Sequence, residues 1–123
     1  MDVVLWVLQA VLAVVMLSAG AMKLIKSKEA LLEDPRMAWV EDFSGSTLRI
    51  IGGLEIAAAV GLILPWWLDI APVLTPIAAL GVVALMTGAM ITHRRRGETQ
   101  ALLLNAAIAL TAVVIAIGRF VAL

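Results

Sequence analysis

Cysteine is absent from this chain of 123 residues, and histidine occurs only once, as His93. Without cysteine, the protein cannot contain a dithiol or disulfide redox centre, an iron–sulfur cluster on cysteine ligands or a thiolate zinc site. A single histidine also argues against a haem or metal site built from several histidines of one chain. We therefore expect no metal site and no covalent cofactor.

Charged residues are scarce and balanced. The chain has nine basic and nine acidic residues, and its formal net charge of zero gives no indication of a nucleic-acid partner. The sequence shows no nucleophile paired with a base, no glycine-rich phosphate loop and no metal-ligand spacing. An autonomous hydrolase, kinase or metalloenzyme is therefore disfavoured, and no catalytic residue is predicted.

Apolar residues dominate instead, at 63% of the chain, with a mean hydropathy of +1.09. A soluble domain of this length cannot bury so much apolar surface. Four long apolar runs each approach the ~20 residues that a helix needs to cross ~30 Å of hydrocarbon. The sequence predicts an all-α integral membrane four-helix bundle, one domain over residues 1–123. Its predicted spans cover about residues 3–25, 47–67, 70–92 and 100–120.

The basic residues predict the orientation of this bundle. Four spans place both termini and the turn between spans two and three on one side of the membrane. Of the nine Lys and Arg residues, all except Arg119 belong to the two loops on the other side or to their flanks. The positive-inside rule then places both termini outside the cytoplasm. Arg119 is expected to extend to the outer headgroups.

The two basic loops differ in character. Residues 27–46 mix charged and apolar side chains, which predicts an interfacial segment along the headgroups. That segment is either a plain connector with an interfacial anchor or a lid over a cavity between the helices. In the second loop, Arg94 to Arg96 act as a topology signal or contact anionic lipids or a partner. His93 is expected to be a solvated loop residue rather than a catalytic base.

Small residues and prolines suggest how the spans pack. Gly53, Ala57 and Gly61 recur at four-residue spacing in span two, which lets helix backbones approach closely in lipid. This stripe packs either inside the bundle or against a second copy, as a homo-oligomer. In span three, Pro72 is expected in the first turn and Pro76 deeper, where it should kink the helix or free a carbonyl.

Glu55 is the most informative residue, because a carboxylate at membrane depth is costly and usually has a partner or a task. Lys23, Arg49, Glu55, His93 and Asn105 all belong to the half of the membrane nearest the basic loops. We expect a polar pocket between the helices, open or openable to the cytoplasm. In it, Glu55 would pair with Lys23 or Arg49, and Asn105 would complete the hydrogen bonds.

Three roles for this pocket remain open. It holds an ion pair that fixes helix register without a ligand, or a site for an amphipathic ligand such as a quinone or a lipid headgroup, or a proton relay for transport. The candidate ligand-binding residues are Lys23, Arg49, Glu55 and Asn105.

Several short segments together form a recognisable pattern: Ala19 to Leu24, Trp39 to Phe43, Arg49 to Glu55, Gly61 to Pro65, Thr92 to Arg95, and Asn105. In these residues the chain resembles the DoxX family of small four-span membrane proteins, and in particular its DoxX-like branch. The resemblance covers nearly the whole chain.

This resemblance implies a multi-pass protein of a bacterial-type inner (plasma) membrane. The founding member of the family is a subunit of a thiosulfate:quinone oxidoreductase, and relatives are linked with membrane complexes that contain a superoxide dismutase and a sulfurtransferase. We therefore expect a non-catalytic subunit or scaffold of a membrane oxidoreductase system, with membrane lipids and a redox enzyme as partners. It would bind a quinone or lipid around Glu55. A small-molecule or proton-coupled carrier and a purely structural adaptor are the alternatives.

Overall fold

A computed structural model describes residues 1–123, and all of its regular secondary structure is helical, as predicted. Four of its helices are long and apolar enough to cross a membrane, whereas two short ones lie between the first and second of these. The elements are α1 (Asp2–Ile25), α2 (Lys28–Leu32), the 3-10 helix η1 (Pro35–Asp42), α3 (Gly45–Leu68), α4 (Leu74–Arg96) and α5 (Thr99–Val121).

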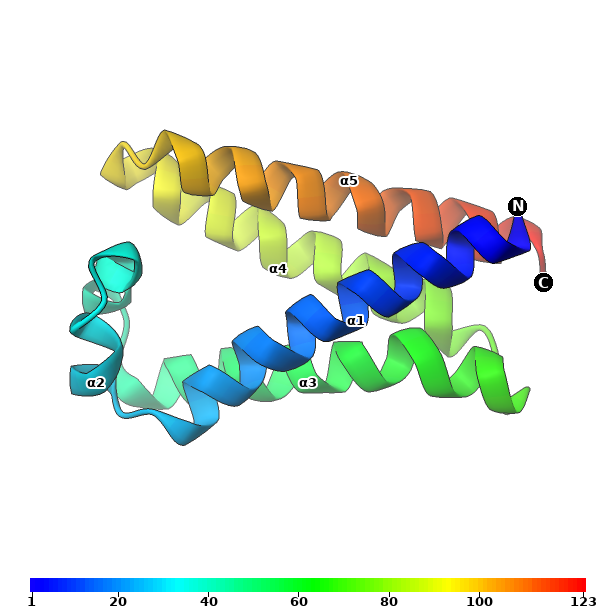
Figure 1. The fold of residues 1–123 in the computed structure, drawn as a ribbon, viewed down its shortest axis with the longest axis horizontal. Helices are drawn as coiled ribbons and strands as arrows, with labels where there is room; N and C mark the ends of the chain where they lie inside the picture. Colours follow the sequence, from blue (N-terminus) through cyan, green and yellow to red (C-terminus); the bar gives the residue numbers. More distant parts are fainter.

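The helices form a bundle with two distinct ends (Figure 1). Both chain termini and the α3–α4 turn lie at one end, which we call the termini end. α2, η1 and the α4–α5 turn lie at the other, the basic end. α1 runs diagonally: it starts beside α5 at the termini end and finishes against α3 at the basic end. α1 and α5 therefore diverge towards the basic end.

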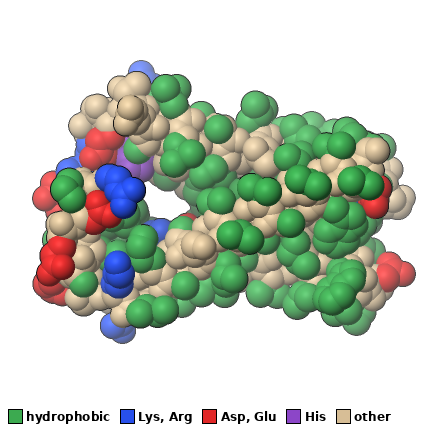
Figure 2. All heavy atoms as spheres, viewed as in Figure 1, with side chains coloured by type: hydrophobic (Ala, Val, Ile, Leu, Met, Phe, Trp, Pro, Cys, Tyr) green, Lys and Arg blue, Asp and Glu red, His purple; other side chains and the backbone are tan.

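On the face shown in Figure 2, apolar side chains cover the bundle along the length of the helices, whereas charged side chains gather at its ends, most of them at the basic end. On α1, for example, Val7, Val11 and Val14 are more than half exposed. Three- and four-residue spacing places them on one face of the helix, which suits contact with lipid.

The α3–α4 turn differs from the prediction at both prolines. α4 begins at Leu74 rather than near residue 70, so Pro72 lies before the helix instead of in its first turn, and Pro76 is the third helical residue. A helix leaves its first N–H groups without intrahelical acceptors, so Pro76 removes no hydrogen bond there, and the predicted disruption of the helix was wrong. Pro65, inside α3, does leave the Gly61 carbonyl without its i+4 donor, and Thr75 Oγ1 donates to that oxygen over 2.8 Å.

α1 and α3 approach each other closely at Gly20 and Gly52. A Cβ added to Gly20 would lie 2.6 Å from the Gly52 carbonyl oxygen, and one added to Gly52 would lie 2.9 Å from the Gly20 carbonyl oxygen. The predicted stripe is only partly used in packing. Gly61 packs on Ala78 of α4, but Gly53 and Ala57 are exposed, with nothing near Gly53. A homo-oligomer contact through Gly53, Ala57 and Gly61 stays a prediction.

Replacing Gly20 by alanine is expected to lower the free energy of unfolding by about 1–3 kcal/mol, because the new methyl group would force the α1 and α3 backbones apart. Gly53→Ala is the matched control: it adds the same methyl group to open space and should be neutral or slightly stabilising. Unfolding in mixed detergent micelles measures both variants. Equal stability of the two would contradict the close contact at Gly20.

Candidate functional site: a cavity around a buried ion pair

A cavity of about 510 Å³ lies at the basic end, where α1 and α5 diverge. Figure 2 shows it as a hollow in this face of the molecule. Thirteen of its 19 lining residues are hydrophobic, so its walls suit an apolar ligand. Its polar side chains are Lys23, Glu55, Thr92, His93 and Asn105.

Lys23 of α1 and Glu55 of α3 form a buried ion pair in this cavity. The Lys23 Nζ lies 2.8 Å from Glu55 Oε1, and the two residues are 7% and 4% exposed. The close contact of Gly20 with Gly52 lies three residues before each of them, so it brings this pair within reach. The carboxylate is thus neutralised by Lys23.

The ion pair leaves hydrogen-bonding capacity unused. Lys23 is the only group of the chain that reaches the Glu55 carboxylate, and no other side chain or backbone N–H donates a hydrogen bond to it. The prediction that Asn105 completes the hydrogen bonds of the pair was wrong, because its side chain makes no hydrogen bond within the chain. A ligand could therefore gain hydrogen bonds here without breaking existing ones.

The four candidate residues are not all together. Glu55, Lys23 and Asn105 line the same cavity, as the sequence suggested. Arg49 does not; it is exposed and lines a separate pocket with the residues that follow α1. Arg49 lies six residues before Glu55, and on a helix this spacing turns the two side chains towards different directions. A ligand-binding role for any of these residues stays a prediction.

His93 was predicted to be solvated, and this prediction was wrong. It is only 6% exposed, lines the cavity and packs edge-on against Trp39, with 5.9 Å between ring centroids. Its Nδ1 lies 2.7 Å from Glu98 Oε1. Because Glu98 accepts as a carboxylate, Nδ1 carries the proton, and Nε2 of a neutral ring remains an acceptor. In the sequence, the three arginines that follow His93 suggested a solvated loop, so its burial was not predicted.

Glu98 is ionised at neutral pH. The hydrogen bond with His93 holds the pKa of Glu98 below its ordinary value; partial burial opposes this, and Arg96 adds to the lowering. A carboxyl group whose pKa is lowered by folding stabilises the fold above its unfolded pKa, and this stabilisation is lost as the pH falls through the folded pKa. The contact therefore persists at neutral pH and weakens only below the ordinary value of 4.5.

η1 contributes Met37 and Trp39 to the lining of the cavity at its basic end, and a lid role for this segment stays a prediction. Arg96 of α4 holds it there: its guanidinium lies 2.9 Å from Glu41 and 3.2 Å from Asp42, and also contacts Glu98. A wide groove beside η1 shares four residues with the cavity and leads to the surface at the basic end. These are Trp39, His93, Leu104 and Asn105.

Replacing Arg96 by glutamine is expected to accelerate amide hydrogen exchange in η1 by about fivefold, because partly exposed ion pairs contribute about 1 kcal/mol to local closure. Arg95→Gln removes the same charge from a neighbour that has no ion pair, and it should leave the exchange unchanged. If both variants exchanged at the wild-type rate, the ion pairs of Arg96 with Glu41 and Asp42 would not hold η1 in place.

A second buried polar cluster lies at the termini end, and here the prediction for Arg119 was wrong. Arg119 is 1% exposed rather than extended towards headgroups. Its Nε donates to Gln9 over 2.6 Å, its Nη1 donates to Asp2 over 2.7 Å, and Gln9 in turn donates to the Leu62 carbonyl. Its guanidinium also lies 4.5 Å from the centre of the Trp66 ring. This cluster ties α1, α3 and α5 together.

Four apolar helices around a buried ion pair and an apolar cavity define a multi-pass membrane protein. The DoxX-like family matches residues 7–115, and the chain belongs to this family, as its resemblance implied. The comparison with curated proteins gave no match. The comparison with solved structures gave none either.

Proposed function

We propose that this DoxX-like protein binds a quinone, or a lipid with a similar neutral head, in the cavity around Glu55. It would do so as a non-catalytic subunit of a membrane oxidoreductase system. The observation that carries the proposal is the buried Lys23–Glu55 ion pair. It faces an apolar cavity of about 510 Å³, and no donor of the chain other than Lys23 reaches the Glu55 carboxylate.

The polar groups of the cavity match the two redox states of a quinone. A quinone carbonyl accepts from the Lys23 ammonium or the Asn105 amide, whereas a hydroquinone hydroxyl donates to the Glu55 carboxylate. Trp39 and Phe43 supply aromatic edges for the ring. The ion pair is neutral as a whole, so a neutral head suits it better than a phosphate, whose buried charge would lack a counter-charge.

The direction of access supports a membrane-borne ligand. The cavity lies where α1 and α5 diverge, so a long apolar tail would extend between these helices into the lipid. By the positive-inside rule, we assign the basic end to the cytoplasmic face of a bacterial-type inner membrane. The head would then bind in the cytoplasmic half of the bilayer, within reach of a redox enzyme docked at that face.

A carrier role has less support than a binding role. Transport requires access to the site from both sides of the membrane. The termini half of the bundle is filled by buried side chains, including Leu62, Val82 and Ile115, and closed by the cluster of Arg119 with Gln9. Because the chain has no cysteine, no thiol couple of its own can reduce a quinone, which favours a subunit beside a separate redox enzyme.

The test is a titration of the purified protein with a short-tailed quinone, followed by quenching of tryptophan fluorescence. Trp39 lines the cavity, and Trp39→Phe should remove most of the quenching. Asn105→Leu is expected to weaken binding up to about tenfold through loss of one hydrogen bond. Thr111→Val, on the same helix but outside the cavity, is the control and should bind as wild type. Absence of saturable quenching in wild type would refute the proposal.

A further inference from the structure

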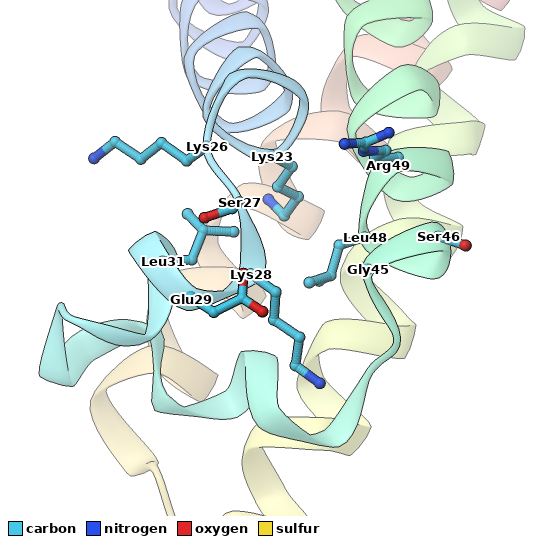
Figure 3. A pocket seen from close by; sticks show the side chains of 10 residues that line it. All are labelled: Lys23, Lys26, Ser27, Lys28, Glu29, Leu31, Gly45, Ser46, Leu48 and Arg49. Atoms are coloured by element: carbon cyan, nitrogen blue, oxygen red, sulfur yellow. The ribbon is translucent and has the colours of Figure 1, made fainter.

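A second pocket, of about 340 Å³, lies at the basic end outside the Glu55 cavity (Figure 3). Its walls come from the end of α1, from α2 and from the start of α3. Only two of its ten lining residues are hydrophobic, Leu31 and Leu48, so it suits a polar ligand rather than an acyl chain. Lys23 lines both cavities, but it is engaged by Glu55.

Unpaired positive charge is concentrated at this pocket. Four of the nine basic residues have a carboxylate within salt-bridge distance: Lys23, Arg36, Arg96 and Arg119. The other five have none, and three of those five, Lys26, Lys28 and Arg49, line this pocket. The only acidic residue that lines it is Glu29. These three basic side chains outnumber the single carboxylate of Glu29, so the pocket carries an excess of positive charge.

The start of α3 adds backbone donors to the same pocket. Ser44 caps the helix by accepting from the Thr47 N–H, but the N–H groups of Gly45 and Ser46 have no acceptor in the chain. Both residues line the pocket, and a Cβ added to Gly45 would meet no atom within 4 Å. Open space therefore surrounds free donors at the positive end of a helix.

We propose that this pocket binds the phosphate group of an anionic phospholipid. Arginine and lysine side chains and free backbone N–H groups are the donors that phosphate oxygens prefer. In Figure 3, Arg49 lies on the α3 wall, Lys28 extends beside the loop that precedes α3, and Lys26 points outward from the rim. Flexible lysines at the rim can turn towards an anion, since no ion pair restrains them.

The depth of the pocket favours a lipid over a free anion. α1 ends at Ile25 and α3 begins at Gly45, so the pocket lies where two membrane helices reach the headgroups. Basic pockets at this level attract anionic headgroups from the adjoining leaflet. A soluble phosphate offers the same chemistry, and the experiment must distinguish these two sources.

The experiment compares lipid adducts by native mass spectrometry after reconstitution in equal parts of phosphatidylglycerol and phosphatidylcholine. Wild type should retain phosphatidylglycerol preferentially. The double variant Lys28→Gln with Arg49→Gln should lose this preference by about tenfold or more, since each basic residue near an anionic surface contributes about fivefold. Arg94→Gln with Arg95→Gln removes the same charge from two unpaired residues outside the pocket and should retain it.

If both double variants lost the preference for phosphatidylglycerol equally, the attraction would be diffuse and the proposal would be overturned. If neither variant lost the preference, the proposal would also be overturned. A charge-retaining variant, Lys28→Arg, should bind as wild type and confirms that charge is responsible. Displacement of the phosphatidylglycerol adduct by an equal concentration of inorganic phosphate would overturn the assignment to a lipid. Lys23 and Glu55 are unchanged throughout, so the outcome is independent of the proposed quinone site.

Discussion

Replacing Glu55 by glutamine is expected to lower the free energy of unfolding by about 3–5 kcal/mol. Glu55 is 4% exposed, and its carboxylate is the only salt-bridge partner of Lys23. Removing one partner of a buried ion pair leaves the other charge without compensation. Unfolding of the variant in mixed micelles, at a pH where lysine is charged, measures the effect.

A double variant isolates the pair from the rest of the fold. Lys23→Met together with Glu55→Gln removes both charges and should recover most of the lost stability, because apolar replacement of a buried pair is often neutral. Glu29→Gln provides the control at an exposed carboxylate without an ion pair and should change stability by less than about 0.5 kcal/mol. A Glu55→Gln protein as stable as wild type would contradict the buried pair.

Replacing Arg119 by alanine should lower the free energy of unfolding by about 3 kcal/mol or more. The substitution empties the space of a fully buried side chain and leaves the Gln9 Oε1 without its donor. It also removes the contact of the guanidinium with the Trp66 ring. The same unfolding measurement applies, with the exposed Arg94→Ala as the control.

The double variant Arg119→Met with Gln9→Leu tests the reason for this loss. It restores volume and removes both polar groups together, so it should be more stable than Arg119→Ala. If Arg119→Ala unfolded like wild type, the arginine would extend to the headgroups after all, as its place near a helix end had suggested.

The membrane fold was predictable because it depends on a property of each segment alone. Four apolar runs of sufficient length require four spanning helices, and the alternation of loops then fixes which ends lie together. The association of Glu55 with Lys23 was also within reach, because few cations occur at membrane depth. The sequence could not choose between Lys23 and Arg49, since that depends on how α1 and α3 are rotated against each other.

Residues whose partners are distant in sequence were not predictable. Gln9 and Asp2 bind Arg119 across 110 and 117 positions, and nothing local to Arg119 indicates them. His93 likewise adjoins three arginines, which suggests a solvated loop, yet Trp39 of η1 covers it. Burial of such polar residues depends on tertiary contacts, which hydropathy does not report.

The contact of α1 with α3 shows the same limit for small residues. The regular stripe of Gly53 and Ala57 was the visible pattern, but the backbones meet at Gly20 and Gly52. A four-residue spacing shows that one face of a helix is smooth, and it does not show what covers that face.

Native mass spectrometry of the gently purified protein tests the central claim, that the Glu55 cavity holds a quinone or a lipid with a neutral head. Wild type should carry such an adduct, and the double variant Lys23→Met with Glu55→Gln, which should remain folded, should lack it. Bare protein in both samples, or the same adduct in both, would contradict the claim and leave the Lys23–Glu55 pair as a structural contact only.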